Sequence, residues 1–410
     1  MNAIAADRGL PQPSRAQRRD QRRYGAALAL LAPAIAFLTV MFAVPIGYIL
    51  FYSVSTPRIS AGIPAFYGAL QRDTAAVPGA EVFTALAAEL IRARDDRSLP
   101  RTLEAVRIQD LPTWQLLRQT AAQLPAEPVG IDRAWFLGID PQWGAADTWS
   151  VIRRASARYT IHHFLHAVDL QRTADGAIMP RPATERVYLG IFANTFTISF
   201  WVAVITLVLG YPLAYYMAGA PPKLANLLLI LVLLPFWTSV LVRAYAWIVL
   251  LQTNGPLNGV LRALGLISEP LSLVHNRAGV YIAMTHVLLP FMILPIYSVM
   301  KTIPPDYIKA AHNLGASPLR AFVRIYFPLT LPGVTAGTLL VFIISLGYYI
   351  TPAIVGGARD RMISMMIAEN INAFVNWGAA AALGTVLLLS TLVIYGLFSH
   401  VVRIDRLKAG

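Results

Sequence analysis

Six long runs of apolar residues limit what this chain can fold into. Most of them are close to the about 20 residues that a helix needs to cross the hydrocarbon core of a bilayer. The fifth run is shorter and extends into residues 329–331. Runs of this length with few charges are typical of transmembrane helices, so we expect an all-α integral membrane protein with six of them. The runs are residues 25–52, 191–217, 224–251, 278–300, 334–350 and 379–398.

The overall composition agrees with a membrane protein. The chain is 56% hydrophobic and 13% charged, whereas soluble domains average about 45–50% and 25%. Cysteine is absent, which excludes disulfides, thiol nucleophiles and thiolate metal sites. A cleavable signal peptide is the alternative for the first run, but such peptides have an apolar core of only about 7–15 residues. We therefore expect an uncleaved anchor in contact with membrane lipid.

The net charge of +13 is distributed as a topology signal. Arginines are concentrated in residues 15–23, directly before the first apolar run. If the N-terminus is cytoplasmic and the chain crosses the membrane six times, both termini and all the lysines lie on the cytoplasmic side, as the positive-inside rule predicts. Stacking aromatic residues are not interleaved with the basic ones, so nucleic acid is not an expected partner. The lysines are Lys223, Lys301, Lys309 and Lys408.

Residues 57–185 differ in composition from the rest of the chain. They contain many arginines and acidic residues and no lysine. Apolar positions recur at helical spacing in residues 81–96 and 147–170, and several prolines divide the stretch into short helices. About 130 residues are enough for one small domain. We predict a mostly α-helical extracytoplasmic insert after the first transmembrane helix.

The segment between the fourth and fifth runs is polar and basic, unlike its surroundings. Pro304 and Pro305 stop the preceding helix, and Asp306 is placed to cap the next one with its carboxylate. We predict a two-turn helix over residues 307–314. Gly315 then supplies the left-handed residue that ends this helix.

A second, amphipathic helix is predicted directly after the glycine. Ser317 and Pro318 have the residue types of an N-cap and a first helical position. Pro328 and Pro332 mark where the chain returns to the membrane. The small side chains at residues 310–311 leave the first helix with a low ridge that a groove on another protein could hold closely. The alternative is an ordinary surface loop whose basic side chains reach past apolar neighbours to water.

This segment resembles the cytoplasmic "EAA" loop of ATP-binding cassette (ABC) importer permeases. That pattern has Glu-Ala-Ala, three residues, Gly, nine residues, Ile, one residue and Leu-Pro. The spacing is intact here, although lysine replaces the glutamate and Phe327 replaces the leucine. Residues 234–258, 288–304 and 347–357 resemble permeases of the spermidine/putrescine type. The resemblance implies an ATPase-coupling loop with Lys309, Ala310, Ala311, Gly315, Ile325 and Pro328 at the pattern positions.

The resemblance also implies the fold, partners and mechanism. It implies the type I ABC importer permease fold in a bacterial inner membrane and alternating access driven by two partner ATPase subunits. A second permease, homologous or identical, and an extracytoplasmic solute-binding protein would complete the importer. The solute would be a polyamine or a related small organic cation. The competing hypotheses are a secondary transporter or channel with a structural loop, and a permease for another solute such as an amino-acid derivative.

Enzymatic chemistry in this chain is not expected. A phosphate-binding Walker loop ends in Gly-Lys-Ser/Thr, and none of the lysines follows a glycine. Neither G-x-S-x-G nor H-E-x-x-H occurs. ATP and Mg²⁺ would therefore be bound by the partner ATPase, and no cofactor is expected here.

The domain organisation follows from the runs and the resemblance together. The expected divisions are a basic cytoplasmic N-terminus (1–24), a first transmembrane helix (25–56), the insert (57–185), a permease core (186–402) with the coupling loop at 301–330, and a cytoplasmic tail (403–410).

Polar and aromatic residues within or beside the runs are candidates for a substrate pathway, because polar groups are costly inside a bilayer. Arg243 could instead extend to the membrane interface, and the aromatic residues could form an interfacial belt. Aromatic faces can also attract a cation. The candidates are Trp237, Arg243, Tyr348, Tyr349, Thr351 and Glu369.

Carboxylates are scarce near these candidates. Between residues 351 and 378 the only acidic residues are Asp360 and Glu369. A desolvated polyamine normally needs carboxylates to balance its charges. Selectivity would then reside in the solute-binding protein, and a solute other than a polyamine stays open.

A histidine cluster in the insert raises the question of a metal site. His162 and His166 would share one helix face, and Asp169 could add a third ligand. The alternative is a partly solvated helix surface that also includes His163. Because a structural site normally has four ligands, we predict no metal site.

Overall fold

The computed structural model describes residues 30–55, 62–127, 130–157, 159–173 and 176–402. The predicted basic N-terminus and the tail 403–410 lie outside these residues. The chain divides into two units, Met1–Tyr52 and Ser53–Gly410. The first apolar run forms the candidate membrane span Leu30–Val54, which includes a π-helical turn, η1 (Thr39–Ala43), and α2 (Val44–Val54).

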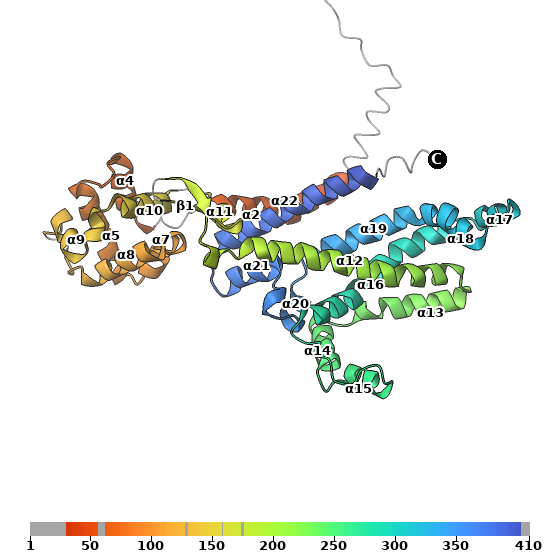
Figure 1. The fold of residues 1–410 in the computed structure, drawn as a ribbon. Helices are drawn as coiled ribbons and strands as arrows, with labels where there is room; N and C mark the ends of the chain where they lie inside the picture. Colours follow the sequence, from red (N-terminus) through yellow and green to blue (C-terminus); the bar gives the residue numbers. More distant parts are fainter. Residues whose placement is uncertain (1–29, 56–61, 128–129, 158, 174–175, 403–410) are drawn as a thin grey trace, which may run out of the picture. The chain divides into compact units, whose positions relative to one another are not determined.

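Four further helices in the second unit are long and apolar enough to cross a membrane. Three of them lie side by side: α12 (Tyr188–Gly219), α16 (Arg277–Thr302) and α19 (Phe327–Leu346) (Figure 1). The central helix is α16, because 61% of its apolar window is buried, more than in any other candidate span of the described chain. The fourth helix, α22 (Trp377–Val402), packs against α21 (Ile363–Asn372).

Glycines bring α19 close to the backbone of α16. A Cβ atom on Gly333 would lie 2.8 Å from the carbonyl oxygen of Pro295 and 2.9 Å from the Cα atom of Ile296. One on Gly337 would lie 3.0 Å from the carbonyl oxygen of Met292. Small residues of this kind are what allow membrane helices to pack tightly.

The third predicted span is not one straight helix but a bent pair of helices. α13 (Pro222–Leu233) and the 3₁₀ turn η4 (Leu234–Trp237) are followed by a bend of 101°, after which α14 (Val240–Leu251) and α15 (Pro256–Ala263) continue. Pro235 has no N–H to donate to a helix. The described chain therefore has five candidate spans, or six if this bent pair counts as one.

A small helical domain precedes α12. Its core contains Phe83, Phe136, Trp143 and Trp149, with ring centroids 4.9–6.3 Å apart. The indole N–H of Trp143 donates to Thr120 Oγ1 at 3.0 Å. The helices are α4 (Pro64–Arg72), α5 (Ala80–Asp95), α6 (Leu99–Thr102), α7 (Glu104–Gln109), α8 (Leu111–Gln123), α9 (Arg133–Ile139) and α10 (Ala146–Ser156).

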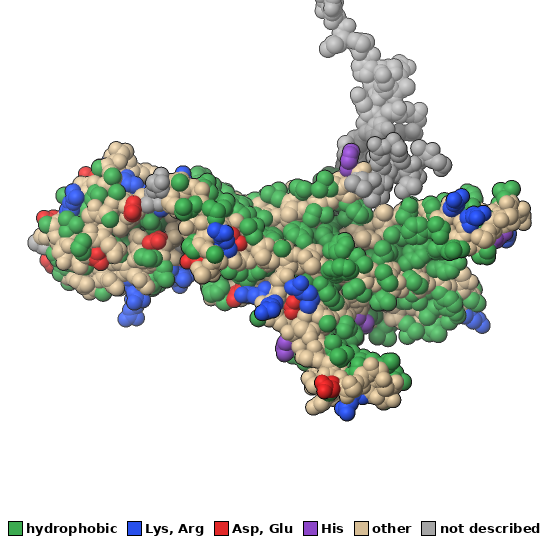
Figure 2. Space-filling view, in the orientation of Figure 1, with side chains coloured by type: hydrophobic (Ala, Val, Ile, Leu, Met, Phe, Trp, Pro, Cys, Tyr) green, Lys and Arg blue, Asp and Glu red, His purple; other side chains and the backbone are tan. Residues whose placement is uncertain are grey.

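The predicted helix over residues 147–170 is interrupted after Ser156 and ends at Ala167, so the prediction was wrong in these two places. The chain is extended at Ala157, and a short helix, α11 (His162–Ala167), follows. Strands β1 (Leu170–Arg172) and β2 (Ile178–Pro180) then form an antiparallel hairpin that the sequence did not predict. Charged side chains gather over the small helical domain, whereas hydrophobic side chains cover the helices from α12 to α19 (Figure 2). This distribution fits a lipid-facing bundle.

Replacing Gly333 by alanine should destabilise the packing of α19 on α16. The added methyl group would meet backbone atoms, which cannot move aside as a flexible side chain can, and overpacking of this kind costs about 1–3 kcal/mol. Thermal unfolding of the detergent-solubilised protein measures the effect. Gly396→Ala in α22 is the matched control, because nothing lies within 4 Å of the place that its added Cβ atom would take. Equal melting temperatures for the two variants would contradict the close approach.

Candidate functional site

The segment after α16 forms the predicted helix, glycine turn and helix restart. α17 (Asp306–Asn313) is followed by Gly315 at φ +83°, and α18 (Pro318–Ala321) begins directly after Ser317. The N–H of Gly315 donates to the His312 carbonyl at 2.9 Å, and the N–H of Ala316 donates to that of Ala311 at 3.0 Å. These bonds close the end of α17 in the way that left-handed glycines usually do.

The first turn of α17 differs from the prediction in one respect. Asp306 does not cap the helix: Pro305 is the N-cap residue, and no side-chain cap bond forms there. The Asp306 carboxylate instead lies 3.1 Å from Lys309 Nζ, three residues along the same helix. The charge of Lys309 thus has a partner within its own helix, and both side chains remain exposed to solvent.

The predicted second amphipathic helix is not separate from the fifth span. Residues Pro318–Leu346 form one continuous helical segment through the π-helical turn η5 (Phe322–Tyr326). Ile325 lies in this turn, and Pro328 is the second residue of α19. Pro328 has no N–H to donate inside this segment, but the π-helical turn directly before it accommodates the proline, so the helix is not broken where the sequence suggested.

Aromatic contacts join this helical segment to α12. The ring centroids of Tyr215 and Tyr326 are 5.3 Å apart, and those of Tyr215 and Phe322 are 5.7 Å apart. The hydroxyl oxygens of Tyr211 and Thr330 are 3.1 Å apart and share a hydrogen bond. A displacement of α17 and α18 would therefore be transmitted to both α12 and α19.

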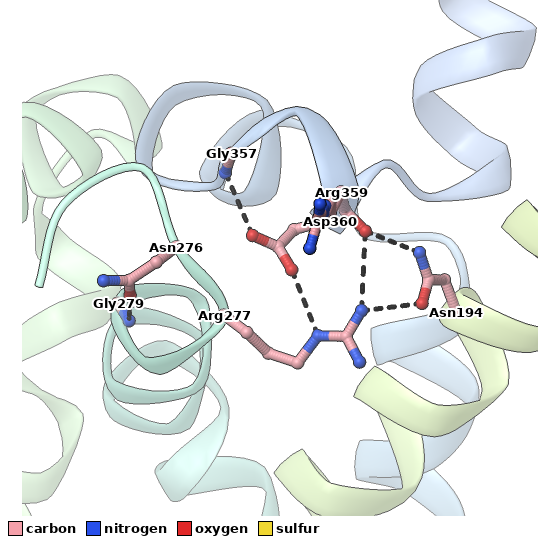
Figure 3. Close-up of polar contacts among 7 residues, drawn as sticks. All are labelled: Asn194, Asn276, Arg277, Gly279, Gly357, Arg359 and Asp360. Carbon is pink, nitrogen blue, oxygen red and sulfur yellow. Dashed lines mark hydrogen bonds and ion pairs between the residues drawn. The ribbon is translucent and has the colours of Figure 1, made fainter.

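A polar network lies near the first turns of α12 and α16 (Figure 3). Arg277, the first residue of α16, donates from Nε to Asp360 Oδ1 at 3.1 Å and from Nη2 to Asn194 Oδ1 on α12 at 2.7 Å. Asn194 Nδ2 donates to the Arg359 carbonyl at 2.6 Å. The other oxygen of the buried Asp360 accepts the N–H of Gly357 at 3.1 Å. We call Asn194, Arg277 and Asp360 the arginine clamp.

The arginine clamp fixes a segment that is not one continuous helix. This segment contains α20 (Ile350–Val355), the 3₁₀ turn η6 (Ala358–Asp360) and α21. Gly357 packs so closely that a Cβ atom would lie 2.2 Å from the carbonyl oxygen of His275. The segment is thus held by one side chain from α12, one from α16 and a backbone contact that requires glycine.

The two acidic residues considered as cation partners are both already paired with arginines. Asp360 is bound by Arg277, and Glu369 on α21 forms an ion pair with Arg361. Their negative charge is therefore balanced within this chain.

The structure brings together only some of the predicted pathway residues. Arg243 on α14 lies near Tyr348, within the range of an electrostatic interaction. Trp237 is in η4 with 75% of its surface exposed, whereas Thr351 is buried in α20. Tyr349 directly precedes α20, and Glu369 is held by Arg361.

His286 and Trp247 belong to the same region and were missed. The indole N–H of Trp247 donates to His286 Nδ1 at 3.3 Å, and Arg243 lies near His286. The side chain of His286 is exposed on α16, well inside a candidate span. The sequence could have indicated His286, because it is the only histidine within the six apolar runs.

The insert histidines do not form the metal site that was weighed. Burial lowers the pKa of His163 to about 4. Burial, together with the nearby Arg181, lowers the pKa of His166 to about 3, so both imidazoles are neutral at pH 7. No group of three metal ligands occurs among the residues that the structure describes.

Asp169 has a different role, at the start of α12. Its carboxylate accepts the backbone N–H groups of residues 187–189 at 2.8–3.1 Å, which the first turn of a helix leaves without partners. Asp169 itself is 2% exposed. The insert thus supplies the cap of a membrane-spanning helix.

Replacing Asp169 by alanine should weaken the start of α12. Loss of a capping carboxylate costs about 0.5–2 kcal/mol. Hydrogen exchange of the amides at residues 187–189 should become faster. Asp132→Ala, which removes the cap of α9, is the control and should leave these amides unchanged. Unchanged protection in Asp169→Ala would refute the capping role.

Comparison with known proteins places the second half of the chain in one family. Residues 210–404 match the family described as "Binding-protein-dependent transport system inner membrane component". The spermidine/putrescine transport system permease protein PotB of Haemophilus influenzae is 36% identical over 209 residues, which are 50% of this chain and 73% of that protein. PotB of Escherichia coli is 36% identical over 198 residues, 48% of this chain and 72% of that protein.

One further sequence relative and one solved structure are also similar to parts of this chain. The inner membrane ABC transporter permease protein YdcU of Escherichia coli is 32% identical over 239 residues, 55% of this chain and 74% of that protein. A crystal structure of a bacterial ABC transporter for the import of alginate covers 53% of this chain and 79% of its own, with 19% identity and a TM-score of 0.43. On the sequence relatives, the chain belongs to the binding-protein-dependent transport system inner membrane components, the multi-pass permease subunits of ABC importers.

Proposed function

We propose that this chain is the permease subunit of an importer for polyamines of the spermidine and putrescine class. The observation that carries the proposal is the 36% identity to PotB over 209 residues. The family match over residues 210–404 includes the bent pair, α16, α17 and α19. The intact geometry of α17, Gly315 and α18 supports the ATP-driven mechanism over a secondary carrier.

In this proposal, two ATPase subunits dock on the segment from α17 to α18 and hold ATP and Mg²⁺. α17 offers an exposed apolar surface to such a partner: Tyr307 is 54% exposed, and Leu314, directly after the helix, is 88% exposed. The intrahelical pair of Asp306 and Lys309 removes the need for an acidic partner opposite the lysine. The residues proposed to contact the ATPase or hold the docking geometry are Lys309, Ala310, Ala311, Gly315, Ile325 and Pro328.

The proposed arrangement in the membrane places both termini and α17 in the cytoplasm. Residues 57–185 and the arginine clamp are then on the outer side, where a solute-binding protein would dock. A second permease completes the pathway, because the exposed polar side chain of His286 in α16 would otherwise face lipid. The domain boundaries expected from the sequence are part of this proposal.

The proposed mechanism is alternating access. Closure of the ATPase pair displaces α17 and α18, which are continuous with α19 and joined to α12 by the aromatic contacts. Because α16 packs against both helices, the three move as one body. The arginine clamp ties the outer segment to the other end of this body, so that both ends change together.

Replacing Gly315 by proline should abolish binding of the ATPase. Proline fixes φ near −65° and cannot adopt the +83° that Gly315 has. We would purify the importer with its ATPase and companion permease and measure the amount of ATPase retained, expecting a loss of at least about tenfold.

Gly265→Pro is the matched control for this experiment. Gly265 has φ +67° and ends α15 with the same pair of backbone hydrogen bonds, in another loop. Retained ATPase in Gly315→Pro would exclude this segment as the main dock. Spermidine uptake by wild-type importer in liposomes tests the solute: an assembled, ATP-hydrolysing importer that takes up no spermidine would refute the polyamine assignment alone.

Breaking the arginine clamp should separate ATP hydrolysis from transport. Arg277→Gln leaves the buried Asp360 without its counter-charge, which destabilises the segment that Asp360 holds. We expect spermidine uptake in liposomes to fall at least about tenfold, while the ATPase remains bound.

The double variant Arg277→Gln with Asp360→Asn is the control for stability. It removes both charges, so its melting temperature should recover more than its transport activity does. Full recovery of transport would show that only charge balance matters and that the geometry of the clamp does not.

A further inference from the structure

Arg243 carries a charge that this chain does not balance. It lies in the first turn of α14, directly after the 101° bend. Its Nε and Nη1 atoms are buried, and neither has a hydrogen-bond partner within the described part of the chain. A guanidinium is always charged at physiological pH, and an ion removed from water without a partner costs several kcal/mol. A partner for Arg243 must therefore come from another molecule.

None of the side chains near Arg243 accepts a hydrogen bond from its Nε or Nη1 atom. His286 on α16 uses Nδ1 to accept the N–H of Trp247, so the remaining nitrogen of the neutral ring is a donor. Tyr348 lies nearby, but a neutral phenol cannot balance a positive charge. Asp360 and Glu369 are bound by Arg277 and Arg361, and Asp306 is paired with Lys309 on α17.

The burial of Arg243 also argues against an extension to lipid headgroups or water. A snorkelling arginine keeps its charged end in the polar interface, whereas two of the three guanidinium nitrogens here are shielded. The apolar side chains beside it, Leu241 and Val242, are 51% and 63% exposed. α14 thus combines an exposed apolar surface with one half of an ion pair.

We infer that the missing half is a carboxylate of the second permease subunit, so that the wall of the pathway becomes neutral only in the assembled pair. This inference rests on the proposed function in one respect: a polycationic solute cannot supply the carboxylate and would be repelled by an unbalanced guanidinium. Trp247, His286 and Tyr348 would lie beside the ion pair, where the two permeases meet.

The test measures how much second permease is recovered with the affinity-tagged chain from the assembled importer in mild detergent. If the second permease is another copy of this chain, the two copies carry different tags. We expect Arg243→Gln to reduce recovery at least about tenfold and Arg243→Lys to retain most of it. Arg262→Gln is the matched control, because Arg262 is an exposed arginine on the adjacent α15.

Two measurements separate an interface role from simple misfolding. The ATPase should remain bound to Arg243→Gln, because α17 is untouched. In addition, Arg243→Glu should lose the second permease, and changing one carboxylate of that subunit to lysine should restore recovery. A scan of its membrane-embedded acidic residues identifies this carboxylate.

Three results would overturn the inference: full recovery of the second permease with Arg243→Gln, no restoring lysine in the scan, or an intact assembly in which only the KM for the solute changes. The last result would place the guanidinium on the solute pathway without a role in the permease interface. Failure of the polyamine proposal would look different, since the importer would assemble through Arg243 and yet not transport spermidine.

Discussion

Backbone groups that enter a bilayer must find their hydrogen-bond partners within the protein, and this constraint explains where the polar side chains lie. Most of the chain between α12 and α22 meets it by being helical. Where the chain leaves the helix beside α20, the Asp360 carboxylate accepts the free N–H of Gly357, and Arg277 balances the resulting charge. Where α12 begins, Asp169 accepts three N–H groups. Buried acids here satisfy backbone donors and arginines, and are not left free for a cation.

The membrane environment also explains the close contact between α16 and α19. With no water to exclude, helices in a membrane gain stability from packing at short distance, and small residues permit it. On α19 these small residues are Gly333 and Gly337. Because the approach is between backbones, it leaves little freedom for one helix to slide on the other. Movement at α17 would therefore be carried by whole helices, as the proposed coupling role of this segment requires.

The sequence predicted features that depend on local chemistry. The apolar runs located α12, α16 and α22 to within a few residues, and Gly315 was recognised because a left-handed helix end favours glycine. Prediction from the sequence failed where a side chain's role depends on partners far away along the chain. Arg277 and Asp360 are 83 positions apart, and no local pattern pairs them. The bend after η4 was hidden because residues 224–251 are apolar on both sides of it.

Arg243 differs from the acidic residues of this chain in whether its charge is balanced within the chain. Asp360 and Glu369, in the segment from η6 to α21, are each neutralised by an arginine of the same chain, so this segment needs no charged partner from another subunit. Arg243 is different, because its guanidinium is shielded without an acceptor in the described chain. A site that is incomplete in one subunit makes pathway formation depend on the arrival of the second. In the proposed importer, an isolated permease subunit would then lack the partner that completes the wall of the pathway.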